Sequence, residues 1–242
     1  MDKVSTYSTQ TFAIPSDSDK TRDLQAWARV AGVCYLVIIV MGLLGQVFVR
    51  GAIVVAGDPA ATLANLAMHG GLWRLGIVAD LIMHLCDIPV IVFLYWLLSR
   101  VNRPLALIAL VSNIIQTAVA VANKINLLLP LLLLDTSTPA LATVFIDAHN
   151  YGFAVALNFF GVSCLIYGYL LARYQLVPTV LAVGLGIAGL CYLLTSLTLL
   201  LAPQLGAYVV FCLLVCLVAE SAFAIRLLWK GIHVESLARL AG

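Results

Sequence analysis

One long apolar stretch, residues 73–98, constrains the fold most strongly because charged side chains recur in it at helical spacing. It contains Asp80, His84 and Asp87 within a run long enough to cross a lipid bilayer. Successive residues of an α-helix turn by about 100°, so positions i, i+4 and i+7 share one face. A charged group in hydrocarbon costs several kcal/mol unless it is paired, neutralised or facing water. Other helices must therefore supply partners for this polar stripe.

The composition indicates that the whole chain is an integral membrane protein. Of its 242 residues, 63% are hydrophobic and 10% are charged, whereas soluble domains average about 45–50% apolar and about 25% charged residues. The mean hydropathy is +1.09. No basic cluster with interleaved aromatic residues indicates nucleic-acid binding. The six cysteines lie inside apolar runs without CxxC spacing, so they are predicted to be small buried side chains.

Six apolar segments reach the length that spans a bilayer, which takes about 20 helical residues. We place them at residues 28–49, 72–98, 105–134, 140–171, 178–202 and 207–230. The predicted fold class is therefore an all-α membrane protein, with a bundle of six transmembrane helices over residues 27–232. Residues 1–26 are expected to be a mobile polar cytoplasmic tail, and residues 233–242 a short cytoplasmic tail. The first apolar segment begins too late for a cleaved signal peptide, so it is expected to remain in the bundle.

Lysine and arginine residues lie mostly on one side of the predicted bundle. With the N-terminus inside, ten of them fall in cytoplasmic segments, and Arg50 alone falls in an outer loop. Under the positive-inside rule, this bias places both termini in the cytoplasm. Arg74, beside Trp73 at the outer end of the second segment, is expected to extend its charge to the membrane interface.

The loop between the first two segments contains the signals of a short amphipathic helix. Asp58 is a suitable N-cap, Pro59 suits the first helical position, and Gly70 and Gly71 are expected to stop the helix. We expect a helix at about Pro59–Met68 on the outer surface. It is expected to be a simple connector or, alternatively, a lid over a cavity.

Further candidate polar residues occur in the third, fourth and sixth segments. Pro130 leaves the carbonyl of Asn126 without its helical hydrogen bond. With a rise of about 1.5 Å per residue, most of the candidates fall within a band roughly 10 Å tall. We expect one buried polar site, open, if anywhere, to the outside. The candidates for ligand or ion binding are Asp80, His84, Asp87, Asn123, Lys124, Asn126, Asp147, His149 and Glu220.

Three functional interpretations follow from these residue types, and whether the chain is an enzyme stays open. Carboxylates outnumber the one firm cation, Lys124, which suits protonated acids in a proton path or a bound cation. The favoured interpretation is a protein that binds a small molecule, a lipid head group or an ion. An alternative is a membrane-embedded hydrolase in which Asp80, His84, Asp87 and His149 hold a divalent metal that activates water, although no HExxH motif is present. A further alternative is a structural subunit of an oligomer or larger membrane complex.

The motifs RLGIVADLIMHLCD (74–87) and FIDAHNYGF (145–153), with several shorter ones, resemble a bacterial family known as domain of unknown function 4386. The resemblance covers nearly all of residues 27–232. It implies a six-helix protein of the bacterial inner membrane and brings no established activity. It also implies that acids or histidine are typical of the family at Asp80, Asp87, Asp147, His149 and Glu220.

The same resemblance implies three departures in this chain. Asn113 stands where the family has a basic residue, Ser163 where it has a histidine, and Thr195 where it has an acid. His84 and Lys124 are then this chain's own, and Lys124 lies only about 20° around the helix from Asn113. If the missing groups are metal ligands or catalytic residues, that chemistry is altered or lost here, which disfavours the hydrolase interpretation.

Overall fold

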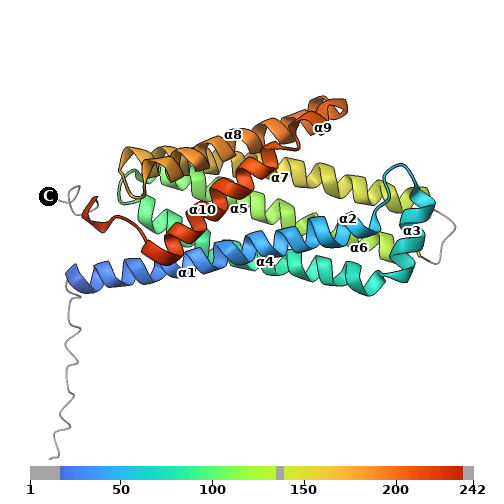
Figure 1. Cartoon of the computed structure of the whole chain (residues 1–242), viewed down its shortest axis with the longest axis horizontal. Helices are drawn as coiled ribbons and strands as arrows, with labels where there is room; N and C mark the ends of the chain where they lie inside the picture. Colours follow the sequence, from blue (N-terminus) through green and yellow to red (C-terminus); the bar gives the residue numbers. More distant parts are fainter. Residues whose placement is uncertain (1–16, 135–138, 237–242) are drawn as a thin grey trace, which may run out of the picture.

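The computed structural model describes residues 17–134 and 139–236 and shows an elongated helical bundle (Figure 1). These described residues form α-helices with short π-helical and 3-10 segments, and no strand is found among them. Six helices are long and apolar enough to cross a membrane. The predicted class, an all-α protein with six transmembrane helices, is thereby confirmed. The orientation of the protein in the membrane stays a prediction.

The first spanning helix consists of three consecutive elements. α1 (Asp17–Leu43) continues into the π-helical segment η1 (Leu44–Arg50) and a final α-helical turn, α2 (Gly51–Ile53). The helix begins within the segment that we expected to be a polar tail, and it ends beyond the predicted limit at residue 49. Residues 1–16 and 237–242, which make up most of the two predicted tails, lie outside the described residues.

The predicted short helix between the first two spans is present as α3 (Pro59–Met68). The Asp58 side chain caps it by accepting a hydrogen bond of 2.9 Å from a backbone amide of the first turn. The stop differs from the prediction, because the helix ends at Met68 with His69 as its C-cap, and Gly70 already begins α4 (Gly70–Leu98). Gly70 does not adopt the positive φ of a helix-terminating glycine. α3 lies across one end of the bundle (Figure 1).

The third span is interrupted by a tight turn at Asn123 and Lys124. Lys124 N donates to Val121 O at 3.1 Å, a bond between residues three apart that tightens the helix locally. The remaining elements are α5 (Arg103–Ala122) and α6 (Ile125–Leu132) of this span, α7 (Pro139–Arg173), α8 (Thr179–Leu201), η2 (Pro203–Leu205), α9 (Gly206–Val209) and α10 (Cys212–Lys230).

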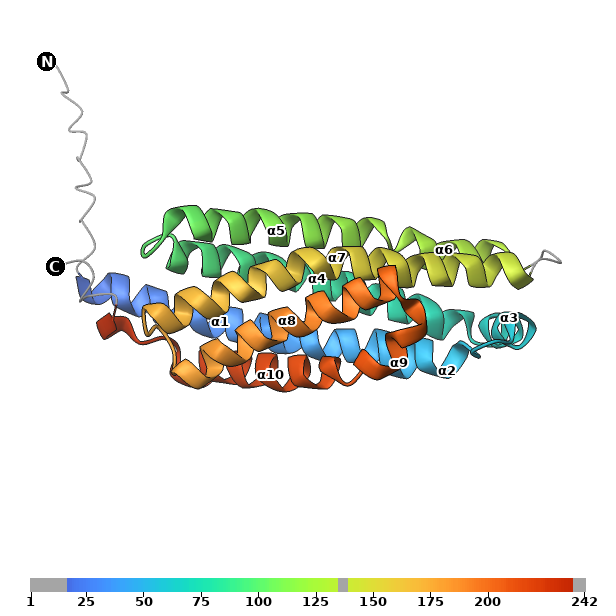
Figure 2. The same cartoon turned by 90° about the horizontal axis from the view of Figure 1, so that it is seen from above.

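Glycines allow two helix pairs to approach closely. A Cβ on Gly168 of α7 would lie 2.6 Å from the backbone nitrogen of Gly186 in α8, and one on Gly32 of α1 would lie 2.5 Å from that of Leu228 in α10. Small residues at membrane helix interfaces bring backbones together in this way. Figure 2 shows the resulting arrangement, with α8 crossing α7 and α10 lying along α1.

Two apolar clusters are found among the described residues, and a polar layer lies between them. The members of this polar layer are Gln46, Arg50, Asp80, His84, Asp87, Asn123, Lys124 and His149. One cluster includes Phe93 and Leu97 of α4, and the other, beneath α3, includes Trp73 and Ile77 of the same helix. The polar stripe of α4 occupies the positions between these two clusters. Packing above and below therefore holds the polar side chains at one depth of the bundle.

Candidate functional site

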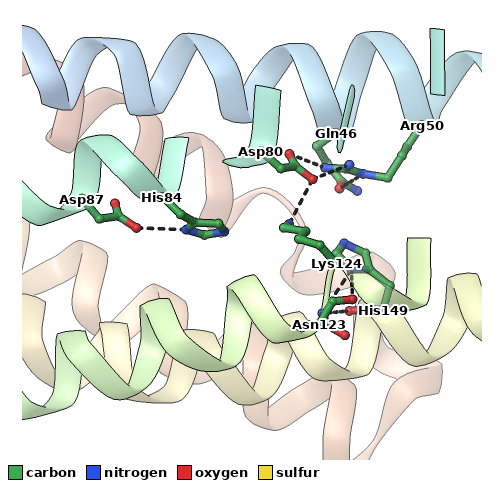
Figure 3. A network of polar contacts seen from close by, with 8 residues as sticks. All are labelled: Gln46, Arg50, Asp80, His84, Asp87, Asn123, Lys124 and His149. Atoms are coloured by element: carbon green, nitrogen blue, oxygen red, sulfur yellow. Dashed lines mark hydrogen bonds and ion pairs between the residues drawn. The ribbon is translucent and has the colours of Figure 1, made fainter. Parts of the chain in front are cut away.

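The centre of the polar layer is one carboxylate held by two cations. Arg50 Nη1 donates to Asp80 Oδ2 at 2.8 Å, and its Nη2 donates to Oδ1 at 3.2 Å. Lys124 Nζ lies 2.9 Å from the same Oδ2 (Figure 3). All three side chains are buried, with Asp80 only 1% exposed. Because the three residues come from the first three spans, this charge triad ties those spans together.

The local structure of the first span makes room for the charge triad. A Cβ on Gly45 would collide with Asp80 Oδ1, so the close approach of the two helices requires glycine there. Arg50 is the last residue of η1, and π-helical turns often occur at functional sites. Gln46 Oε1 accepts a further hydrogen bond of 2.8 Å from Arg50 Nε, so the guanidinium is held on two sides.

The structure corrects the predicted place of Arg50, which we had assigned to an outer loop. Its guanidinium lies inside the bundle because the first helix continues through η1 and α2 to Ile53. The apolar sequence that follows it, Ala52 to Ala56, is the signal that could have identified this continuation. Trp73, which we had placed at the interface beside Arg74, is also buried, and its Nε1 donates to a backbone carbonyl of α6 at 2.7 Å.

The turn that carries Lys124 is fixed to α7 by an amide and an imidazole. Asn123 Nδ2 donates to His149 O at 2.8 Å and lies 3.1 Å from His149 Nδ1. Asn126 Nδ2 in turn donates to Asn123 Oδ1 at 2.9 Å. Gly152 leaves space for this contact, since a Cβ there would collide with the Asn123 side chain. The role of these residues is to position the Lys124 ammonium.

His84 and Asp87 form a hydrogen-bonded pair on α4, and one nitrogen of this pair has no partner. His84 Nδ1 lies 3.0 Å from Asp87 Oδ2, and Thr117 Oγ1 of α5 donates to the same oxygen at 3.2 Å. The opposite ring nitrogen, His84 Nε2, is buried and has no hydrogen-bond partner. Figure 3 shows the imidazole between Asp87 and the Lys124 ammonium. A buried nitrogen without a hydrogen-bond partner costs about 1–3 kcal/mol. His84 Nε2 is therefore the atom of this site at which a further hydrogen-bond partner would be stabilising.

Glu220 lies apart from the charge triad. Tyr192 Oη of α8 donates to Glu220 Oε2 at 3.0 Å. Glu220 Oε1 and Thr195 Oγ1 are both buried without a hydrogen-bond partner. No hydrogen bond or ion pair within the described ranges links Glu220 to the charged residues of α4 or of the third span. We call Glu220 and Tyr192, with Thr195 one turn further along α8, the Glu220 corner.

Asp147 takes no part in the polar layer. Its side chain is exposed on α7, two residues from the buried His149. Consequently the surplus of carboxylates that we predicted is not found at the centre, where two cations face Asp80 and the His84–Asp87 pair lies alongside. The remaining hydrogen-bonding capacity consists of His84 Nε2 and the Lys124 ammonium, which has three N–H groups and one acceptor in Asp80.

The four residues considered as metal ligands, Asp80, His84, Asp87 and His149, do not form a ligand cluster. In the part of the chain that the structure describes, no group of three or more His, Cys, Asp or Glu side chains is placed to hold a metal ion. Both Asp80 oxygens accept from cations. The Lys124 ammonium beside them would repel a metal ion at this position.

Comparison with known proteins yields a family and no activity. Neither the curated proteins nor the solved structures contain a significant match. A family model described as "Domain of unknown function (DUF4386)" matches residues 30–231, which contain every residue of the polar layer and of the Glu220 corner. The family suggested by the sequence motifs is thus confirmed, and the chain belongs to the DUF4386 family of proteins, whose function is unknown.

Proposed function

We propose that this chain is a multi-pass membrane protein that binds the polar group of a small molecule or lipid in the layer between Asp80 and Asp87. The observation that carries the proposal is the unpartnered Nε2 of His84, a residue that is 3% exposed and whose ring points toward the Lys124 ammonium in Figure 3. A buried polar atom of this kind is ordinarily satisfied by protein or by an ordered partner. A ligand atom between the imidazole and the ammonium would satisfy both groups.

The charges favour a ligand that offers oxygen acceptors over a bound cation. Asp80 is already neutralised by Arg50 and Lys124, and Asp87 is engaged by His84 and a threonine hydroxyl. The spare capacity is therefore the N–H groups of Lys124 and one imidazole nitrogen, which is an acceptor or a donor according to its protonation. A carbonyl, hydroxyl or carboxylate group would match this capacity.

A structural role is the second candidate, and the charge triad favours it. Arg50, Asp80 and Lys124 leave no buried nitrogen or oxygen without a partner, and they join three spans. On this alternative, the chain is a subunit of an oligomer or larger membrane complex. The hydrolase alternative has less support, because the metal-ligand cluster that it requires is not found among the described residues.

Native mass spectrometry of the purified full-length chain, released from nanodiscs of defined lipid, tests the proposal. We expect a small-molecule or lipid adduct on the wild type, a loss of most of it in His84→Phe, and its retention in the matched control Cys86→Ala on the same helix. Thermal unfolding of the three proteins checks that each is folded. Equal adducts on all three, or none on the wild type, would overturn the proposal in favour of the structural role. Metal analysis of the same samples tests the hydrolase alternative.

The proposal includes a location in the bacterial inner membrane with both termini in the cytoplasm. Supporting it, the start of α1, the α4–α5 and α7–α8 connections and the end of α10 lie at one end of the bundle (Figure 2). These segments carry most of the lysines and arginines, as the positive-inside rule requires of a cytoplasmic side. Reporter fusions to the C-terminus, active only on one side of the membrane, test this orientation.

A further inference from the structure

An open cavity of about 600 Å³ lies at the end of the bundle where α10 ends, away from the polar layer. Its lining combines the last turns of α10, including Arg226 and Lys230, with the segment that follows. Gln25 of α1 and Gln175 of the α7–α8 connection complete the wall. Three parts of the chain that are distant in sequence therefore meet around one basic cavity.

The wall after α10 is held in a defined position. Gln25 Nε2 donates to Ile232 O at 2.8 Å, and Ile232 N donates back to Gln25 Oε1 at 3.2 Å. His233 N donates to Leu176 O at 2.8 Å. Gly231 makes the turn with φ +62°, a conformation that favours glycine, and a Cβ there would collide with the Gln25 side chain. These contacts show that the segment after α10 has a fixed position and forms a defined wall of the cavity.

Arg226 brings an uncompensated charge to this cavity. Its Nε and Nη1 are buried and have no hydrogen-bond partner. Within residues 17–134 and 139–236, no carboxylate lies at ion-pair distance from Arg226 or from Lys230, one turn later. Glu235 also lines the cavity, but its side chain is exposed and it pairs with neither cation. The Arg226 side chain as a whole is half-buried, but two buried N–H donors without a partner are costly, so the cavity offers donors for an acceptor that the described residues do not supply.

We propose that this cavity binds a phosphate group, carried either by an anionic phospholipid or by a soluble phosphate compound. Guanidinium and ammonium groups are the side chains that proteins use for phosphate, because they combine full positive charge with several N–H donors. Basic pockets between the cytoplasmic ends of membrane helices are typical sites for phospholipid head groups. The site is independent of the ligand proposed for the polar layer, since it shares no residue with it.

Native mass spectrometry of the full-length chain in detergent, titrated separately with phosphatidylglycerol and with inorganic phosphate, tests this proposal. We expect phosphatidylglycerol to bind the wild type and to bind Arg226→Gln about 10- to 100-fold more weakly, as loss of a charge-assisted hydrogen bond predicts. Lys230→Gln removes a charge at an exposed position, where we expect no effect on folding, and it should weaken binding by a smaller factor. Arg103→Gln removes an exposed charge at the same end but outside the cavity, and it should bind like the wild type.

The two titrations distinguish the sources of the phosphate group. Binding of phosphatidylglycerol that depends on Arg226, with weak competition from inorganic phosphate, assigns the cavity to a lipid. Tighter Arg226-dependent binding of inorganic phosphate assigns it to a soluble phosphate compound. If Arg226→Gln, Lys230→Gln and Arg103→Gln all bind both probes like the wild type, or if neither probe binds the wild type, the proposal is wrong.

Discussion

The carboxylates of Asp80 and Glu220 are buried in the same bundle, yet Asp80 is surrounded by cations and fully paired, whereas Glu220 has a neutral neighbour and an oxygen without a partner. Asp80 receives three contacts from Arg50 and Lys124 and uses both of its oxygens. Glu220 receives one hydrogen bond from Tyr192 and keeps Oε1 without a partner. In a membrane, where water cannot satisfy such groups, an acid is either neutralised by its neighbours or marks a place that is left open.

The three residues at which the sequence resemblance implies a departure from the family differ in how they are hydrogen-bonded. Asn113 Nδ2 donates to Tyr167 Oη at 2.6 Å, and Ser163 Oγ donates to a carbonyl of α5 at 3.1 Å, so both side chains are hydrogen-bonded. Thr195 is the exception, because its hydroxyl, one turn after Tyr192 on α8, is buried without a partner. The charge triad is thus complete in this chain, whereas the Glu220 corner contains a group that its neighbours do not satisfy.

The largest expected difference between the two regions is the effect of neutralising each acid. Asp80→Asn leaves Arg50 and Lys124 buried without a counter-charge, and we expect it to lower the free energy of unfolding by about 3–5 kcal/mol. Denaturant titration in a fixed detergent measures this change. The exposed Asp147 provides the control, since Asp147→Asn should change stability by less than about 0.5 kcal/mol. Similar values for the two variants would show that the charge triad does not stabilise the bundle.

Glycine substitutions test whether the polar layer is as tightly fitted as the structure indicates. Gly45→Ala pushes a methyl group against Asp80, and Gly152→Ala pushes one against Asn123. We expect each to lower the free energy of unfolding by about 1–3 kcal/mol, the usual range for overpacking. A Cβ on Gly71 meets nothing within 4 Å, so Gly71→Ala is the matched control and should not destabilise the chain. Equal free energies of unfolding for the three variants would show that the polar layer is not tightly packed around Gly45 and Gly152.

A smaller effect is expected for Glu220→Gln than for the corresponding change at Asp80. The amide keeps an oxygen that accepts from Tyr192, and no ion pair within the described residues is lost. We expect the free energy of unfolding to fall by less than about 1 kcal/mol, within the net value of a single hydrogen bond. Thermal unfolding in detergent measures it. A loss as large as that of Asp80→Asn would remove the distinction between the two regions.

The smallest expected change in stability is the difference between removing two neighbouring hydroxyls on α8. Thr195→Val removes a buried hydroxyl without a partner and should be neutral or stabilising. Ser196→Ala removes a hydroxyl that accepts from Asn158 at 2.6 Å and donates to the carbonyl of Ala154, and it should cost about 1 kcal/mol. The same denaturant titration compares them, and destabilisation by Thr195→Val would reveal a partner for that hydroxyl.

The sequence predicts the position of each group along its helix better than the direction in which it points. Spans, the short helix α3 and the shared depth of Asp80 and Lys124 follow from apolar run lengths, capping residues and helical rise. The rotation of α7 about its axis depends on packing against several helices, and it decides that His149 is buried while Asp147 is exposed. No local pattern contains that information.

Partners supplied by other helices were also beyond the sequence. Tyr192, the hydrogen-bond donor to Glu220, lies in a nearly featureless apolar run, where tyrosine is ordinary in a membrane helix. Arg50 was assigned to a loop because the first apolar run was taken to end just before it. The apolar residues after Arg50 were a sequence signal that the helix continues, whereas its pairing with Asp80 of α4 is a contact that only the folded bundle contains.

The order in which the charge triad's members occur along the chain bears on how the protein enters the membrane. A helix with an ionised aspartate at depth is inserted at a penalty of about 2.5–3.5 kcal/mol on the translocon scale. Arg50 precedes Asp80 by 30 residues, so the first two spans together already contain a cation that can pair with the acid before the third span is inserted. Lys124 then arrives with the third span and contacts a carboxylate that is already in place. The order of the triad along the chain therefore allows Asp80, and then Lys124, to meet its partner on a span that is inserted earlier.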